Sequence, residues 1–295
     1  MNITVLMTCL ILDSFALAGS EKSDLNLEPD TMWTYKHIDG KDLQMSVFLP
    51  DDYREEGPFP TIVFFHGGSW NAGEASWHYP DCAYWSKRGM IAVSVDYRLK
   101  DRDGVAVPLE CVKDAKSSIR FLRKNAIKLK VNTDKLVVSG GSAGGQIAAA
   151  LATIKSTETN DNSYDLSISC IPDAVVLQNP YFKCTPELSP PNYITEGIPP
   201  FITFLGDEDP VITVAEMRAF HNAIKQAGNA SELYIGKGGK HGFCNGRNSD
   251  NPFFYWSLEL VDQFLVNHGI LAGESIVERP AGVKQLQKGD YDVCR

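Results

Sequence analysis

The sequence lacks any apolar run of the roughly eighteen residues that a membrane-spanning helix requires. It also lacks an excess of positive charge, because the formal net charge of its 295 residues is −9. A nucleic-acid-binding face needs clustered Lys and Arg to neutralise phosphates, so the composition argues against a nucleic-acid partner. Internal repeats and low-complexity tracts are absent, and a hydrophobic content of 43% suits one large globular domain with a substantial core.

Cysteine patterns typical of metal sites are missing as well. No C-x-x-C pair and no cluster of His and Cys at ligand spacing occurs, so we expect neither a metal nor a cofactor. In an oxidising compartment six of the cysteines could form up to three disulfides, with fifteen alternative pairings; buried free thiols are the other interpretation. The six are Cys82, Cys111, Cys170, Cys184, Cys244 and Cys294.

The N-terminal segment, residues 1–18, differs in composition from the rest of the chain. It is mostly apolar and ends on Ala16-x-Ala18, a small-residue pattern typical of signal-peptide cleavage. We therefore expect an exported protein, secreted or periplasmic. Two features oppose this interpretation: no Lys or Arg precedes the apolar run, and Asp13 interrupts it. A mis-assigned start or a short buried helix is the alternative.

Short apolar runs alternate with helical patterns along the remainder. An Asp39-Gly40 turn between two alternating segments predicts a β-hairpin near the start. The pattern as a whole predicts an α/β domain over 30–272, followed by a tail over 273–295. Its sheet is expected to be mostly parallel and twisted, with about eight strands and helices on both faces. Strands are expected at 61–65, 91–95, 136–139, 173–177, 201–205 and 231–235, the last at the sheet edge, and helices at 80–88, 108–129, 146–152, 213–228 and 252–268.

One stretch organises the site: Gly140-x-Ser142-x-Gly144 lies between a strand pattern and a helix pattern. This spacing is typical of a nucleophile elbow, a strained turn that exposes a serine hydroxyl above a sheet. The glycines permit close packing and backbone angles that a Cβ would resist. The alternative is a glycine-rich turn with an incidental serine.

The loop His66-Gly67-Gly68-Ser69-Trp70 directly follows an apolar strand pattern. Its two glycines would leave backbone N–H groups free to point into a pocket, beside the N–H of Ala143 behind the elbow serine. We therefore expect an oxyanion hole formed by the amides of Gly68, Ser69 and Ala143; an ordinary turn is the alternative.

An acidic loop and a histidine loop follow two later strand patterns. In Gly206-Asp207-Glu208-Asp209-Pro210 we expect Asp209 to orient a histidine, with Asp207 as second choice, although such acidic runs are often simply exposed. His241 lies in the loop Lys240-His241-Gly242-Phe243, which follows the last strand pattern and precedes the last helix. The order Ser142, Asp209, His241 matches the order that a Ser-Asp-His triad takes in such a fold.

Two other histidines, His221 and His268, fall within a helix and at a helix end, where a structural role is expected.

From about Trp33 to Leu271 the chain resembles the α/β-hydrolase superfamily, and within it the secreted carbohydrate esterases of acetyl-xylan and feruloyl type. This resemblance implies the triad Ser142, Asp209 and His241 and the oxyanion donors named above. It rests on His66-Gly67-Gly68-Ser69-Trp70, Asp96-Tyr97-Arg98-Leu99, Gly140-Gly141-Ser142-Ala143-Gly144-Gly145, Gly206-x-x-Asp209-Pro210 and Lys240-His241-Gly242-Phe243.

Two positions depart from the related hormone-sensitive-lipase-like esterases. Those proteins usually carry a third glycine where Ser69 stands and an aspartate where Gly141 stands. Arylformamidases share a His-Gly-Gly-x-Trp loop and therefore remain a competing resemblance.

A short segment between Pro180 and Pro200 leaves room for only a minimal lid. An open cleft favours small acyl groups on a bulky carrier, so we expect a serine esterase that removes acetyl, or feruloyl, groups from carbohydrates. Three alternative functions remain: an arylformamidase, a peptidase of the same fold and a catalytically silent binding protein. The sequence does not indicate the oligomeric state. Four aromatic side chains are candidates for stacking on a sugar or aryl group, with core packing as the alternative: Trp70, Trp77, Tyr181 and Phe243.

Overall fold

Nine strands form one sheet in the computed structural model, which describes residues 26–161 and 165–294. Their order is β1-β2-β4-β3-β5-β6-β7-β8-β9. The block from β4 to β8 is parallel, and antiparallel pairs flank it at both ends. The strands are β1 (Thr31–Ile38), β2 (Lys41–Phe48), β3 (Phe59–Phe65), β4 (Ile91–Val95), β5 (Val131–Gly141), β6 (Ala174–Gln178), β7 (Phe201–Gly206), β8 (Ser231–Gly236) and β9 (Tyr291–Cys294).

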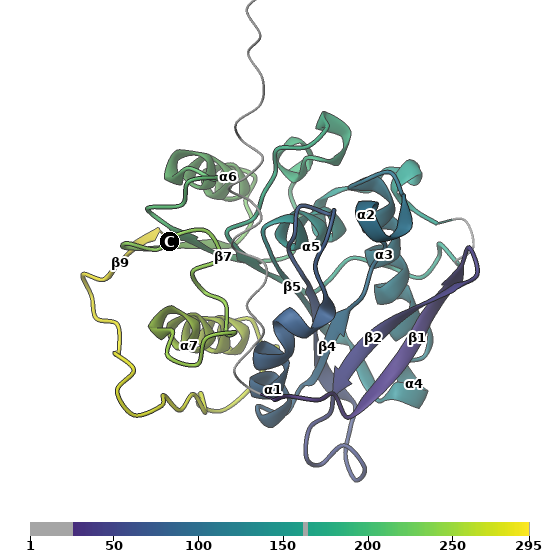
Figure 1. The fold of residues 1–295 in the computed structure, drawn as a ribbon, viewed down its shortest axis with the longest axis horizontal. Coiled ribbons are helices and arrows are strands. Elements are labelled where there is room, and N and C mark those ends of the chain that lie inside the picture. Colours follow the sequence, from purple (N-terminus) through teal and green to yellow (C-terminus); the bar gives the residue numbers. More distant parts are fainter. Residues whose placement is uncertain (1–25, 162–164, 295) are drawn as a thin grey trace, which may run out of the picture.

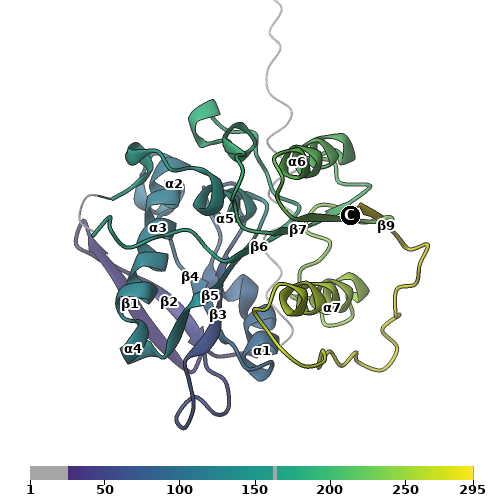
Figure 2. The same cartoon turned by 180° about the vertical axis from the view of Figure 1, so that it is seen from behind.

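Helices cover both faces of the sheet, as the sequence predicts. In Figure 1 and in the reverse view of Figure 2, α3, α5 and α6 lie on one face, and α1 and α7 lie on the other. The α-helices are α1 (Tyr79–Lys87), α2 (Lys100–Asp103), α3 (Leu109–Lys124), α4 (Ala126–Leu129), α5 (Ala143–Thr153), α6 (Val214–Gln226) and α7 (Pro252–Asn267). Short 3-10 turns are η1 (Ala75–His78), η2 (Thr157–Thr159), η3 (Pro186–Leu188) and η4 (Pro190–Tyr193).

The central strand β3 is almost entirely apolar, from Ile62 to Phe65, because both of its faces are covered. Val63 and Phe65 pack into the core under α3 and α5, whereas Ile62 and Phe64 pack into the core under α1 and α7. Successive side chains of a strand point to opposite faces, so a strand covered on both faces needs apolar residues throughout.

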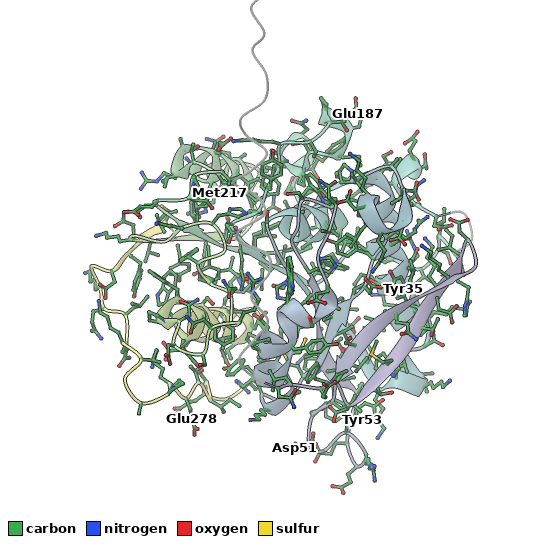
Figure 3. The ribbon with its side chains drawn as sticks, viewed as in Figure 1. Tyr35, Asp51, Tyr53, Glu187, Met217 and Glu278 are labelled. Atoms are coloured by element: carbon green, nitrogen blue, oxygen red, sulfur yellow. The ribbon has the colours of Figure 1, made fainter. Side chains whose placement is uncertain are left out.

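Side chains outside the sheet likewise divide into apolar ones that face the core and charged ones that face solvent. Met217 points from α6 toward the sheet and is 2% exposed, whereas Glu187 in η3 points outward (Figure 3).

The predicted hairpin turn is confirmed, and a capping box defines the start of a helix. The Asp39-Gly40 turn joins β1 to β2, and both of its residues have positive φ, 51° and 72°. Thr213 and Glu216 form a reciprocal capping box at the start of α6: each side chain accepts a hydrogen bond from the other's backbone amide.

The prediction of a single helix over 108–129 is wrong in its extent. The structure divides this segment into α3 and α4 at Asn125, whose backbone leaves the helical region at φ −103° and ψ 16°. The Asn125 side-chain amide donates to the Phe121 carbonyl at 2.8 Å. An asparagine that bonds its own helix in this way competes with continuation of the helix.

The sheet edge also differs from expectation. The 231–235 strand, β8, is not at the edge, because β9 from the C-terminal tail pairs with it antiparallel, from Leu233↔Cys294 to Gly236↔Tyr291. The alternating run Tyr291 to Cys294 is too short to stand out as a strand without its partner.

All six described cysteines are free thiols, so the structure contains none of the disulfides that their even number allows. The predicted signal segment, residues 1–18, lies outside the described residues. Within the described ranges, no helix is both long enough and apolar enough to cross a membrane.

Candidate active site

Ser142 lies at the apex of a strained turn between β5 and α5. Its backbone has φ 53° and ψ −118°, a conformation that L-residues adopt rarely and at a cost of about 1–3 kcal/mol. Two glycines make the turn feasible. A Cβ on Gly140 would lie 2.3 Å from the Gly144 carbonyl oxygen, and one on Gly144 would lie 1.9 Å from the Phe65 carbonyl oxygen. The sequence spacing therefore reflects real steric requirements.

The structure brings the three predicted residues into one hydrogen-bonded chain. The Ser142 Oγ lies 2.9 Å from His241 Nε2, and His241 Nδ1 lies 2.8 Å from Asp209 Oδ2. With the proton on Nδ1, the imidazole donates to Asp209 and offers the Nε2 lone pair to the serine hydroxyl. This arrangement can withdraw a proton from the hydroxyl as Oγ attacks an electrophile.

Asp209 is held as a carboxylate. Its side chain is 0% exposed, and Oδ1 accepts the backbone amides of Val211 at 2.8 Å and Ile212 at 3.0 Å. Burial alone would raise the pKa of this carboxyl, but His241 and the two amides outweigh burial and hold the pKa below its usual value. The ionised group can therefore stabilise an imidazolium at neutral pH.

Asp207, the second choice for this role, is placed differently. Asp207 is exposed directly after β7, and its Oδ1 accepts the amide of Gly238, in the turn after β8, at 2.7 Å. The structure thus gives Asp207 a turn-stabilising contact and gives Asp209 the contact with histidine.

The His66 to Trp70 loop approaches the elbow closely. A Cβ on Gly67 would lie 3.1 Å from the Gly141 carbonyl oxygen and 3.4 Å from the Ser142 Cβ. Gly68, Ser69 and Trp70 all have positive φ, at 104°, 55° and 59°. The extra Cβ at Ser69 is therefore accommodated in the left-handed conformation that a glycine would adopt more cheaply.

Three backbone amides, two in the His66 to Trp70 loop and one directly after Ser142, have no acceptor among the described residues and could serve an oxyanion. Within the described part of the chain, the amides of Gly68 and Ser69 make no hydrogen bond. Ala143 is the first residue of α5, and an amide in a helix's first turn has no intrahelical acceptor. These are the donors that the sequence predicts.

The side chain of His66, the first residue of this loop, helps to hold the loop in place, a role that sequence reasoning did not find. It is completely buried, and burial lowers its pKa to about 3, so the ring is neutral. Its Nδ1 donates to the Gly67 carbonyl at 2.8 Å, while the Tyr97 hydroxyl donates to the His66 carbonyl at 2.6 Å. The stacked ring of Tyr97, at a centroid distance of 4.3 Å, completes the support.

Asn179, which follows β6, is a second residue that sequence reasoning missed. It is 2% exposed, and its Oδ1 accepts the amide of Gly242, the residue after His241, at 3.2 Å. An asparagine before a proline looks like an ordinary loop residue, and no local signal indicates a contact 63 residues away.

The four candidate stacking residues divide into two pairs. Trp70 and Phe243 are 7% and 9% exposed, and the Trp70 Nε1 donates to Gln146 Oε1 at 3.2 Å. This burial favours the packing alternative for both residues, and their substrate-binding role stays a prediction. Tyr181 and Trp77 remain half-buried.

Tyr181 lines a pocket of about 310 Å³ between α6 and the segment after β6. The pocket walls are mainly apolar, and Lys183 and Glu216 form an ion pair at 3.1 Å beside it.

His221 and His268, for which a structural role is expected, both make packing or hydrogen-bond contacts away from Ser142. His221 Nδ1 lies 2.9 Å from Ser231 Oγ, and the ring of His268, the residue that caps the end of α7, packs on Phe264 with centroids 4.6 Å apart. Within the described ranges, no group of three or more His, Cys, Asp or Glu side chains is arranged to hold a metal ion.

Known proteins match this fold and this chain. The BD-FAE family matches residues 45–178. The chain is similar to Thermogutta terrifontis esterase 2 phosphorylated by paraoxon, at 37% identity and a TM-score of 0.78, covering 83% of this chain and 96% of that one. The same esterase with propionate bound matches at 36% identity with the same TM-score and coverage.

Two curated relatives match over shorter shares of their length. Esterase LipQ of Mycobacterium tuberculosis is 25% identical over 66% of this chain and 52% of its own. Endo-1,4-beta-xylanase B of Butyrivibrio fibrisolvens is 26% identical over 58% of this chain and 30% of its own. The chain thus spans about half the length of these curated relatives or less.

The chain belongs to the α/β-hydrolase superfamily of serine esterases. Identity above 30% across nearly the whole length of a solved esterase places it there, and the α/β-hydrolase fold expected from the sequence is confirmed.

Proposed function

We propose that this protein is a serine carboxylesterase that acts through an acyl-enzyme. The hydrogen-bonded chain from Ser142 through His241 to Asp209, set beside amides without an acceptor, is the observation that carries the proposal.

Acylation follows from this geometry. The Ser142 Oγ attacks the ester carbonyl carbon as His241 Nε2 takes the hydroxyl proton, and the Asp209 carboxylate stabilises the imidazolium. The amides of Gly68, Ser69 and Ala143 supply hydrogen bonds to the oxyanion. When the tetrahedral intermediate collapses, the carbon–oxygen bond to the alcohol breaks and His241 returns the proton to the departing oxygen.

Deacylation repeats the sequence with water. His241 removes a proton from a water molecule as the water oxygen attacks the acyl carbon. His241 then returns that proton to Ser142 Oγ as the carboxylic acid leaves. Each cycle therefore consumes one ester and one water and restores the free enzyme.

For the substrate we propose short acyl groups, acetyl first and feruloyl second, carried by a carbohydrate outside the cytoplasm. Residues 179–200 between β6 and β7 contain only η3 and η4, so this segment has room for only a small lid. The relative with bound propionate and the relative named as a xylanase support the acyl size and the carrier respectively. Half-buried Tyr181 and Trp77 offer aromatic surface for a sugar or an aryl group.

The reaction is tested with p-nitrophenyl acetate. Ser142→Ala and His241→Ala should each lower kcat by at least 10³-fold, as expected of residues that act as a unit. Paraoxon should phosphorylate Ser142 in the parent and fail to label Ser142→Ala, which mass spectrometry of the intact and digested protein detects. Turnover near the parent level in either variant would refute the mechanism.

The substrate class needs its own assay. Release of acetate and ferulate should be measured from a panel of acylated glycans, with simple alkyl esters as the reference. We expect higher kcat/KM on the glycan esters. An equal preference for simple esters would leave the mechanism intact and refute the carbohydrate assignment.

A further inference from the structure

We propose that Asn179 is a positioning residue for the candidate base, fixing His241 through the backbone of Gly242. The proposal rests on the esterase mechanism above, because its effect is measured as esterase turnover. Asn179 touches neither the reacting atoms nor the imidazole; its side chain acts on the next residue of the histidine loop.

The hydrogen bond from the Gly242 amide to Asn179 Oδ1, at 3.2 Å, joins two loops that are distant in sequence. Gly242 has φ 78°, so the histidine loop turns sharply just after His241. A fixed amide at that turn restricts rotation of the peptide between His241 and Gly242. The direction in which the imidazole leaves the backbone is thereby restricted as well.

Asn179 itself is held in an unusual conformation. Its φ is 39°, in the left-handed region where asparagine is tolerated better than most residues. Its own amide donates to the Phe204 carbonyl at 2.7 Å, on the strand that leads to the Asp209 loop. A buried residue in a strained conformation that spans two strand ends is a feature typical of functional sites.

The surrounding tetrapeptide Gln178 to Tyr181 bonds to the elbow, to the histidine loop and to β7, the strand that leads to Asp209. The Gln178 carbonyl accepts the Ser142 amide at 3.0 Å, and the Tyr181 amide donates to the Ser142 carbonyl at 2.9 Å. The backbone of this stretch therefore holds the serine, and the Asn179 side chain holds the histidine loop. Together these contacts set the Oγ to Nε2 separation of 2.9 Å.

Two substitutions separate the side chain from the backbone. Asn179→Gly permits the left-handed conformation and keeps the amide to Phe204, but it removes the acceptor for Gly242. Asn179→Asp keeps an acceptor oxygen and also tolerates the left-handed conformation.

For Asn179→Gly we expect kcat to fall roughly 10- to 100-fold, with KM within about twofold, because a misplaced base weakens the transition state more than substrate binding. For Asn179→Asp we expect kcat to recover to within roughly threefold at high pH. Its acid limb should move to higher pH, because a carboxylate beside the histidine loop favours the imidazolium.

Asn229 provides a matched control. Its Oδ1 accepts the amide of Gly197 at 2.8 Å, so it ties a loop through a glycine amide in the same manner, away from the three candidate residues. Asn229→Ala should lower the melting temperature and leave kcat within about twofold of the parent.

The outcomes are distinct. A glycine variant with parental kcat and only a lower melting temperature would overturn the proposal, as would an aspartate variant with the kcat loss and pH profile of the glycine variant. Failure of the esterase mechanism would look different, because Ser142→Ala would then retain turnover whatever the variants at Asn179 do.

Discussion

At the scale of the residue, two aspartates in one loop take different roles because different amides surround them. The Asp209 carboxylate accepts hydrogen bonds from the amides of Val211 and Ile212 and from His241. Within the described residues, the Asp207 carboxylate accepts only the amide of Gly238, in the turn after β8. Charge and residue type are identical, so the difference arises from where β7 ends and where the next helix begins.

Replacing each aspartate by asparagine separates these roles. Asp209→Asn should lower kcat by roughly 10²- to 10⁴-fold, because an amide cannot balance an imidazolium and can hold the wrong histidine tautomer. Asp207→Asn keeps an oxygen acceptor for Gly238 and should leave kcat within about threefold. Steady-state kinetics of both variants on p-nitrophenyl acetate decide the matter, and equal losses would refute the assignment.

The lowered pKa of Asp209 predicts how the stability of the protein depends on pH. The pKa of Asp209 is lowered by folding, so its ionised form contributes stability that is fully present above the unfolded pKa of about 4 and is lost as pH falls through the folded pKa. The parent should therefore lose more stability on acidification than Asp209→Asn, as urea unfolding between pH 6 and pH 3 would measure.

At the scale of the element, the sequence reveals each loop better than the contacts between loops. The elbow, the glycine-rich loop and the histidine loop could be predicted because each carries local residue types that their backbones require. Asn179 and His66 could not, because their importance lies in bonds to Gly242 and to the oxyanion loop that only the folded chain creates. The roles of Trp70 and Phe243 were undecided for the same reason, since exposure is a property of the assembled sheet.

The elbow glycines offer a direct test of close packing between elements. A Cβ at Gly144 would lie 1.9 Å from the Phe65 carbonyl oxygen, so α5 would have to move away from β3. Gly144→Ala should therefore lower the free energy of unfolding by about 3 kcal/mol or abolish folding. At Gly141 the nearest atom to an added Cβ is 3.7 Å away, and Gly141→Ala should change stability by less than about 1 kcal/mol.

Denaturant unfolding, or soluble yield where Gly144→Ala does not fold, compares the two variants. Equal stability would show that the elbow can relax and that its glycines are not steric requirements.

At the scale of the whole molecule, the chain after α7 returns to the sheet and adds β9 as its edge strand. Arg88, the residue that caps the end of α1, donates to the Asp262 carboxylate of α7 at 2.7 Å and to the Ala272 carbonyl at 2.9 Å, which fixes the start of this segment. Figure 1 shows the segment passing outside α7 before β9 joins the edge. A paired edge strand covers backbone groups of β8 that would otherwise be open to another chain.

Tyr291 is the side chain that fastens this returning strand. Its ring packs against Trp256 at 4.9 Å and against Tyr234 at 6.4 Å, whereas Val293 on the same strand is 42% exposed. Tyr291→Ala should lower the free energy of unfolding by about 2 kcal/mol through lost aromatic packing, and the melting temperature by roughly 4–8 °C. Val293→Ala should change the free energy by about 0.5 kcal/mol or less. Thermal and urea unfolding of the two variants measure the difference, and similar losses would mean that β9 is held by its backbone pairing alone.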